Sequence, residues 1–341
     1  MDAEPTVTEK LQSYAKELGL RAICVIRDVG FTKLLPSLQS VGGIIIEKGV
    51  LSSLEAQGFS FDVFKHNRSE SKPEALFDGL AKYWKKRSFN PNRQALKVAS
   101  AMAFKVFGCQ GQKLEPLPLD ERLISTIKTG KSSGAPEFVK KGEAFLKDLT
   151  RAKRVLKERG RKPYCVPWRR TQPGKDGPKV RLVWGYPQAV TLMEARFARP
   201  LIDRFVSQPS VMAFGLSDAG LGARLIPISN MGSRLSLDFS GFDSSIHDEL
   251  ISIAFSVMAT HFRELNEEER RCWQFIRGYF TNTPIAMPDG QLYVKRRGVP
   301  SGSYFTQIVD SIVNFLVVQY AFLQAHQITI HPSRSTNNRD G

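Results

Sequence analysis

Two carboxylates, five residues apart, are the side chains of this sequence best placed for chemistry. Asp238 lies at the C-terminal end of an alternation of apolar and polar residues over 234–239, and that alternation predicts a strand. Asp243 follows a Ser-Gly turn, near the start of a predicted amphipathic helix. A carboxylate at the end of an apolar strand is costly to bury unless a cation meets it, and a divalent metal ion would do so. Asp243 has a second interpretation, as the N-cap of its helix.

A loop of small residues, 298–306, leads into an apolar helix that carries a polar stripe. Glycines near both ends of the loop let the backbone approach a ligand closely. Polar side chains then recur every four residues along one side of the helix. Such a stripe either forms its own hydrogen-bond ladder or faces a polar ligand, because unpaired polar groups are costly to bury. The stripe consists of Thr306, Asp310 and Asn314.

Basic residues are concentrated between residues 147 and 181. This segment has 13 Lys or Arg and three acidic residues, a net charge of +10 out of +16 for the whole chain. A positive field attracts polyanions, so nucleic acid is the first partner to consider and an acidic membrane surface the second. The segment ends in a predicted strand, residues 179–184. Its charge indicates either a solvated face or a phosphate-binding ribbon.

The composition is that of a globular protein with a sizeable core. Of 341 residues, 42% are hydrophobic and 10% aromatic, which excludes disorder of the whole chain and fits one large or two smaller domains. The four cysteines are far apart, so we expect free buried thiols and neither a disulfide scaffold nor a zinc ribbon. The N-terminus has no secretory signal. The apolar segment 308–325 contains four polar residues and is predicted to be a buried helix, not a membrane span.

Helical patterns cover residues 73–107 and 188–206, and we interpret the first as plain core helices. Glu194 in the second is expected to be a structural ion-pair partner and not a catalyst. The loop 129–136 contains Gly-Lys-Ser, but Ser125 stands where a phosphate-binding P-loop needs glycine, which argues against that motif.

Taken together, these segments resemble the viral RNA-dependent RNA polymerases, most closely those of partitivirus-like and picobirnavirus-like double-stranded RNA viruses. The matches follow the order of the family's motifs G, F, A and B. The matching segments are Ser132-Ser-Gly-Ala-Pro136 for motif G, Lys179-Val-Arg181 for motif F, Asp238-x4-Asp243 for motif A, and Gly298-Val-Pro-Ser-Gly-Ser-Tyr-Phe-Thr306 with Asp310, Ser311 and Asn314 for motif B.

The resemblance implies an α+β right-hand fold of fingers, palm and thumb. Residues 1–233 would form the fingers region, with an N-terminal extension and motifs G and F. Residues 234–330 would form a partial palm with motifs A and B, and 331–341 a polar tail. The sequence has no Gly-Asp-Asp, the family's motif C hairpin. We therefore expect the motif C hairpin and the thumb to be missing.

The resemblance also implies an activity: RNA-directed RNA polymerisation, in which two Mg²⁺ or Mn²⁺ ions assist nucleotidyl transfer from NTP to an RNA 3′-hydroxyl. Asp238 would be the catalytic and metal-binding residue. A carboxylate at position 243 accepts a hydrogen bond from a ribose 2′-hydroxyl, whereas reverse transcriptases place an aromatic residue there. The other implied roles are nucleotide or ribose binding by Asp243, Ser301, Thr306, Asp310 and Asn314, triphosphate binding by Lys179 and Arg181, and template binding by Ser133, Gly134, Pro136 and Gly302.

Several alternatives stay open from sequence. Either Asp310 or Asn314 contacts the nucleotide. The chain is expected to be a C-terminally truncated and inactive polymerase, and the alternative is a non-enzymatic RNA-binding viral remnant. Its expected partners are template and product RNA, NTPs and the viral capsid protein. Its expected location is the host cytoplasm or the virion interior, without secretion or a membrane span.

Overall fold

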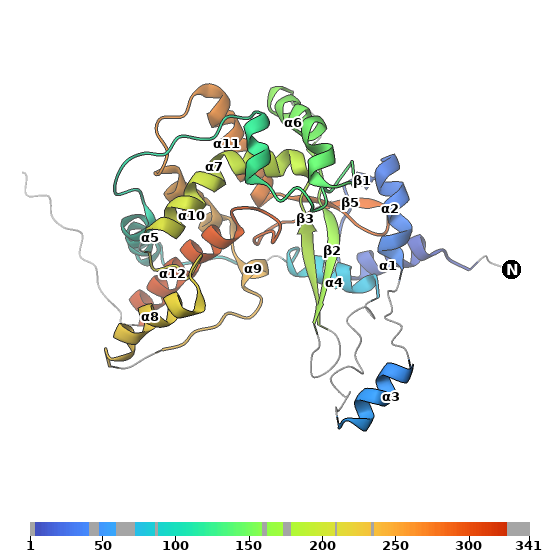
Figure 1. The fold of residues 1–341 in the computed structure, drawn as a ribbon, viewed down its shortest axis with the longest axis horizontal. Helices are drawn as coiled ribbons and strands as arrows, with labels where there is room; N and C mark the ends of the chain where they lie inside the picture. The colour runs from blue at the N-terminus through green and yellow to red at the C-terminus, as the bar shows by residue number, and fades with distance from the viewer. Residues whose placement is uncertain are drawn as a thin grey trace, which may run out of the picture.

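The computed structural model describes residues 4–40, 48–58, 72–85, 88–158, 162–172, 179–208, 210–232 and 235–325. Within these ranges the chain is mostly helical, with two small sheets (Figure 1). The helices are α1 (Val7–Glu17), α2 (Val29–Gln39), α3 (Lys48–Ala56), α4 (Glu74–Lys82), α5 (Arg93–Phe107), the 3-10 helix η2 (Glu121–Thr126), α6 (Lys141–Lys157), α7 (Gln188–Ser207), α8 (Asp218–Ser229), α9 (Phe242–Ser245), α10 (Asp248–Ala259), α11 (Glu267–Thr281) and α12 (Thr306–Ala325).

Both sheets are antiparallel. One has the order β1 (Cys24–Val25), β5 (Gln291–Val294), β4 (Pro284–Ala286). The other is a ribbon of β2 (Val166–Gln172) and β3 (Lys179–Gly185), which extends from the helical body in Figure 1. A bridge between Cys165 and Ile285 connects the ribbon to the first sheet. The ribbon confirms the strand expected over 179–184.

One hydrophobic cluster reaches from α1 to α12 and joins the two regions expected as fingers and palm. α7 runs through it with most of its residues buried. α12 packs against α5 and α10. Aromatic rings fill the space between α10, α11 and the start of α12, where the rings of Phe255 and Phe305 lie 5.4 Å from each other and that of Trp273 lies 5.5 and 5.9 Å from them. The functional segments therefore rest on a continuous core.

Several expectations need correction. Residues 235–239 form no strand, because no described segment pairs with them. The core helices expected over 73–107, by contrast, are confirmed as α4 and α5. The helix after Asp243 is interrupted at His247, whose ring nitrogen accepts the Glu249 N–H and caps α10. Cys24 is exposed and Cys109 half-buried, whereas the two other thiols are buried as expected. Residues 331–341 lie outside the described ranges.

α12 is long and apolar enough to cross a membrane by length and composition. It is the only such helix among the described residues. Its buried side, with Ile308, Val309, Ile312, Val313 and Leu316, packs into the main cluster, but only 28% of its most apolar stretch is buried, so the helix is less buried than expected. This packing gives no clear sign of a membrane span.

Candidate functional site

The loop 298–306 is fastened to the turn that contains Asp243. Gly298 N–H donates to the Ile246 carbonyl at 2.8 Å, and Val299 N–H donates to the Asp243 carbonyl at 2.7 Å. Gly298 has a φ of +81°, which favours glycine. A side chain at Gly302 would collide with the carbonyl oxygen of Trp184 at the end of β3. These contacts hold three sequence segments together in the structure: the ribbon, the acidic turn and the loop.

Asp243 in α9 interacts electrostatically with both Arg181 in β3 and Asp310 in α12. Burial raises the pKa of Asp243, and Arg181 opposes that shift. Burial, and then the charge of Asp243, raise the pKa of Asp310 to about 8. Asp310 Oδ1 is buried and has no hydrogen-bond partner in the described structure. The predicted motifs A, B and F therefore contribute to one electrostatic environment.

Tyr83, at the end of α4, belongs to the same environment and was missed by sequence reasoning. Its ring packs edge-on against Trp184 at 5.3 Å, and a side chain at Gly298 would touch it. Burial first, then Asp243 and more weakly Asp310, raise the pKa of its hydroxyl. The helical spacing identified Tyr83 only as a core residue, and nothing local in the sequence marks its proximity to the carboxylates.

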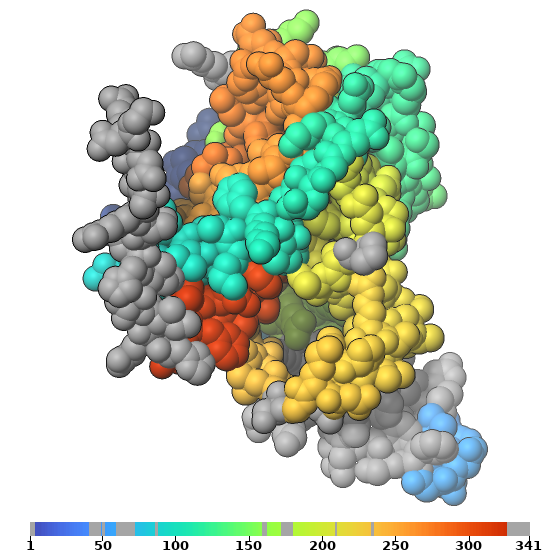
Figure 2. Space-filling view, turned by 90° about the vertical axis from the view of Figure 1, so that its left-hand side faces the viewer, coloured from blue at the N-terminus to red at the C-terminus, as the bar shows by residue number. Residues whose placement is uncertain are grey.

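The stripe on α12 lines a cavity of about 600 Å³. Figure 2 shows a hollow between α12, in red, and the gold segment that contains α8. Asp310 and Asn314 line the cavity, but the Thr306 hydroxyl lies 2.9 Å from the carbonyls of both Pro300 and Ser303. The stripe is therefore divided: Thr306 closes the loop, and the two other residues face open space. The cavity is lined by Phe107, Val211, Met212, Ala213, Phe214, Phe242, Gln307, Asp310, Ser311, Asn314, Phe315 and Val318.

Asp238 is exposed. Its Oδ1 accepts the N–H of Phe239 at 2.9 Å. Leu235 and Leu237, which would alternate on a strand, have exposed fractions of 68% and 53%. Among the described residues, no group of three or more His, Cys, Asp or Glu is arranged to hold a metal ion. Asp238 alone is therefore at most one ligand of such a site.

The ribbon places two guanidinium groups opposite each other. Arg170 on β2 pairs in register with Arg181 on β3, so both side chains lie on the same face. Like charges directly opposite each other destabilise a sheet, and a bound anion would remove that cost. Ser301 in the nearby loop is exposed. The side chain of Lys179 lies outside what the structure describes.

The predicted motif G segment, residues 132–136, packs against the first turn of α7. Ser133 is buried, its N–H donates to Val139 O, and its carbonyl accepts from Gln188 N–H, both at 2.8 Å. Gly134 has a φ of +70°, and Pro136 lines a second cavity of about 530 Å³. The charged residues of that cavity are Arg27, Asp28, Arg151, Arg154, Glu158 and Lys162, a basic excess of two.

Glu194 is fully buried in α7 and differs from its expected role as an ion-pair partner. Its described hydrogen-bond partners are the Ser303 hydroxyl at 2.7 Å and the Tyr304 N–H at 2.9 Å. Sequence spacing could not reveal this contact, because 109 residues separate Glu194 from Ser303.

Comparisons with known proteins agree with this arrangement. Residues 174–337 match the family described as viral RNA-dependent RNA polymerase. The RNA-directed RNA polymerase of Cryptosporidium parvum virus 1 (strain KSU-1) is 33% identical over 157 residues, which make up 45% of this chain and 29% of that protein. The chain therefore matches less than a third of that relative's length.

Solved structures extend the likeness to most of the chain. The RNA-dependent RNA polymerase of a human picobirnavirus, an insertion-loop deletion mutant, has a TM-score of 0.59 at 19% identity, covering 93% of this chain and 60% of that one. A sicinivirus RNA-dependent RNA polymerase has a TM-score of 0.61 at 16% identity, covering 78% of this chain and 59% of that one. The shared fold is the right hand of these polymerases. Residues 174–337 thus match the viral RNA-dependent RNA polymerase family, and the chain shares its fold with these solved polymerases.

Proposed function

We propose that this chain forms the fingers and the first part of the palm of a double-stranded RNA virus polymerase, which transfers nucleotides from NTP to an RNA 3′-hydroxyl. The observation that supports this best is the joining of Arg181, Asp243 and Asp310 from three separate segments. A guanidinium suits a triphosphate, and two neighbouring carboxyl groups suit the hydroxyls of a ribose.

The two carboxyl groups would divide the recognition of ribose between them. With a pKa of about 8, Asp310 is protonated at neutral pH and can donate a hydrogen bond, as an asparagine amide would. Asp243 would accept a hydrogen bond from a 2′-hydroxyl. We propose Asp310, not Asn314, as the primary ribose contact because Asp310 Oδ1 is buried without a partner. Asn314 and Ser301 would contact the nucleotide from the cavity and the loop, and Thr306 would act by closing the loop.

The triphosphate would bind at the ribbon. Arg170 and Arg181 lie opposite each other on the ribbon, and a bound anion would relieve the repulsion between their charges. Lys179 lies two residues earlier on β3. The template would pass the motif G segment, with Ser133, Gly134 and Pro136 beside the basic cavity, and would meet the loop at Gly302. We propose RNA and NTPs as partners on this basis. The capsid protein and a location in the host cytoplasm or virion interior follow from the viral relationship alone.

Mg²⁺ or Mn²⁺ would provide the charge stabilisation of nucleotidyl transfer. The described residues do not form a site for it, because Asp238 is a single exposed carboxylate and Mg²⁺ needs several oxygen ligands. We assign Asp238 the role of one ligand and derive no catalytic step from it. The same observation favours the second candidate function, RNA binding without polymerisation.

One experiment tests both functions. We would measure single-stranded RNA binding at several salt concentrations, and template-directed incorporation, with the 341-residue chain and with Arg181→Ala and Asp238→Ala. We expect salt-dependent binding, whose slope in log–log form falls by about 0.7 in Arg181→Ala because one phosphate contact is lost. Exposed Arg122, which pairs with Asp120, gives the matched control Arg122→Ala. Incorporation abolished by Asp238→Ala would establish polymerisation, whereas binding without incorporation would support the second function. Binding that ignores salt would contradict both.

A further inference from the structure

The buried side chain of Glu194 accepts two hydrogen bonds from the loop 298–306, and the proposed nucleotidyl transfer gives it no role. Its two oxygens accept from the Ser303 hydroxyl at 2.7 Å and from the Tyr304 N–H at 2.9 Å. Both donors follow Gly302, which has no room for a side chain beside Trp184. A carboxyl group with no exposed surface is costly unless it is hydrogen-bonded. This arrangement therefore connects α7 to the loop at its tightest point.

A second side chain of α7 holds the same residue of the loop. The Arg199 guanidinium lies 4.6 Å from the centre of the Tyr304 ring, and its Nη2 is 3.1 Å from the Tyr304 hydroxyl. Glu194 fixes the backbone of Tyr304, and Arg199 fixes its ring. The C-terminal end of the loop is thus anchored to α7 in both main chain and side chain.

The N-terminal end of the loop has its own buried anchor. Lys295 is fully buried, and its Nζ donates to the carbonyls of Gly298 and Thr281, both at 2.7 Å. Between the two anchors, Ser301 is exposed. The loop is therefore held at both ends by buried ionisable side chains, and its centre faces solvent.

We propose that Glu194 is a positioning residue, which holds the loop 298–304 so that Ser301 faces the ligand. It acts through hydrogen bonds and does not itself touch RNA or nucleotide. Burial raises the pKa of Glu194 to about 8, and a neutral carboxyl can still accept from Tyr304 N–H while its own hydroxyl donates to Ser303. Glu194 can therefore hydrogen-bond the loop whether or not it carries a negative charge. The effect on RNA binding rests on the proposed function, whereas the effect on the loop does not.

Three substitutions separate hydrogen bonding from simple filling of space. Glu194→Gln keeps an acceptor for Tyr304 N–H and a donor for Ser303. Glu194→Met keeps the volume but offers neither. Ser303→Ala removes one of the two bonds and tests the proposal from the loop side. Asp203→Asn, on the exposed side of the same helix, is the matched control.

Hydrogen exchange of the peptide covering residues 299–305 provides the decisive measurement. We expect exchange there to rise about tenfold in Glu194→Met, since two hydrogen bonds are lost, and less in Ser303→Ala. In Glu194→Gln and Asp203→Asn, the exchange rate of this peptide should stay close to that of the wild type. Peptides from α5 and α11 should keep their protection in all variants. Wild-type protection of the loop in Glu194→Met would overturn the proposal. So would an equal rise throughout the molecule, which indicates a role in overall stability alone.

RNA affinity of the same variants then tests the consequence for the ligand. Glu194→Met should weaken binding of a single-stranded RNA several-fold with an unchanged salt slope, because no phosphate contact is removed. Glu194→Gln should restore affinity. A loop that opens without any loss of affinity would overturn the role in ligand binding. If the wild-type chain binds no RNA, the proposed function fails, and the exchange experiment still decides the role of Glu194.

Discussion

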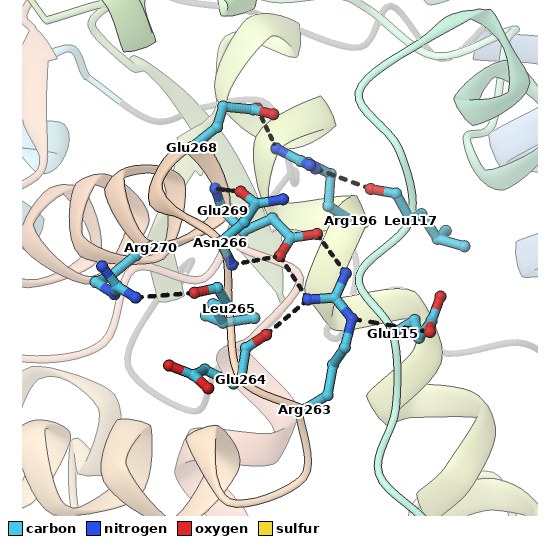
Figure 3. Close-up of polar contacts among 10 residues, drawn as sticks. All are labelled: Glu115, Leu117, Arg196, Arg263, Glu264, Leu265, Asn266, Glu268, Glu269 and Arg270. Atoms are coloured by element: carbon cyan, nitrogen blue, oxygen red, sulfur yellow. Dashed lines mark hydrogen bonds and ion pairs between the residues drawn. The ribbon is translucent and has the colours of Figure 1, made fainter.

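Two regions of this molecule differ in how their polar and apolar side chains are packed. Where α7 meets α11, polar groups are fully matched: Arg263 contacts both carboxylate oxygens of Glu269 at 2.8 and 2.9 Å, and Glu269 also completes the capping box of Asn266 (Figure 3). Arg196 joins Glu268 to the Leu117 carbonyl. Between residues 210 and 240, by contrast, α8 has no buried residue.

The second region has Met212 in the main core but keeps many of its other apolar residues at the surface. Ile226, Met231 and Leu235 have exposed fractions of 64%, 78% and 68%. An apolar surface of this kind promotes association unless it is covered. Asp238, the predicted catalytic residue, lies in this region, whereas Glu194 lies in α7 on the well-packed side. Asp238 therefore lies in a segment with little buried apolar surface, whereas Glu194, which anchors the loop 298–306, lies in a well-packed helix.

Gly302→Ala should have the largest effect, because the loop contacts the well-packed region there. The new Cβ would meet the Trp184 carbonyl and could be relieved only by moving backbone. We expect a loss of about 3 kcal/mol in the free energy of unfolding, measured with denaturant. Gly278→Ala in α11, where a Cβ meets nothing within 4 Å, should instead be neutral or stabilising. Equal effects in both variants would show that Gly302 is not packed as described.

Arg196→Ala tests the matched polar groups directly. The Arg196 side chain is almost fully buried, so its loss leaves the Leu117 carbonyl without its donor. We expect about 2 kcal/mol of destabilisation. Arg271→Ala removes an exposed pair with Glu267 on the same α11 and should cost less than about 0.5 kcal/mol. If both variants lost the same free energy of unfolding, the buried ion pair of Arg196 would contribute no more to stability than the exposed pair of Arg271.

Asp310→Asn tests whether the buried carboxyl group of Asp310 makes the stability of the protein depend on pH. The folded pKa of Asp310 is raised to about 8, so between pH 4 and pH 8 the unfolded chain loses this proton while the folded chain keeps it. Stability therefore falls as pH rises through this window. The asparagine variant lacks this loss and should gain stability relative to wild type from pH 5 to pH 8 in denaturant unfolding. A difference that does not change with pH would mean that Asp310 titrates normally.

Leu237→Ser should have the smallest effect on stability, within about 0.5 kcal/mol, because Leu237 is more than half exposed. It should reduce self-association, measured by light scattering. Leu192→Ala, in buried α7, is the comparison from the other region and should cost about 3 kcal/mol. A large loss of stability in Leu237→Ser would show that this segment packs more closely than described.

Local patterns predicted the elements well where apolar spacing coincides with burial. The helix over 188–206 and the strand over 179–184 were both predicted, because apolar residues recur in their sequences with a helical and a strand period. The strand over 234–239 was not confirmed, since a strand exists only when another segment pairs with it. The strand propensity of residues 234–239 does not show whether another segment lies beside them to pair with.

The candidate site was predictable in its residue types and not in its geometry. The order of the motifs pointed to Arg181, Asp243 and Asp310, but their electrostatic coupling depends on burial that no spacing reveals. Tyr83 and Glu194 were missed as site residues because their partners are distant in sequence. Thr306 was expected to face a ligand and instead closes its own loop.

The pairing of β1 with β5 determines when the N-terminal segment can dock during synthesis. Cys24 pairs with Leu292, and the side chain of Gln12 donates to the Asp289 carbonyl. The ribosome makes these N-terminal residues first and their partners more than 260 residues later. Caps at Thr6 and Asp28 let α1 and α2 form early from local contacts alone. β1 therefore cannot pair until β5 has been made, whereas α1 can pack against α4 earlier.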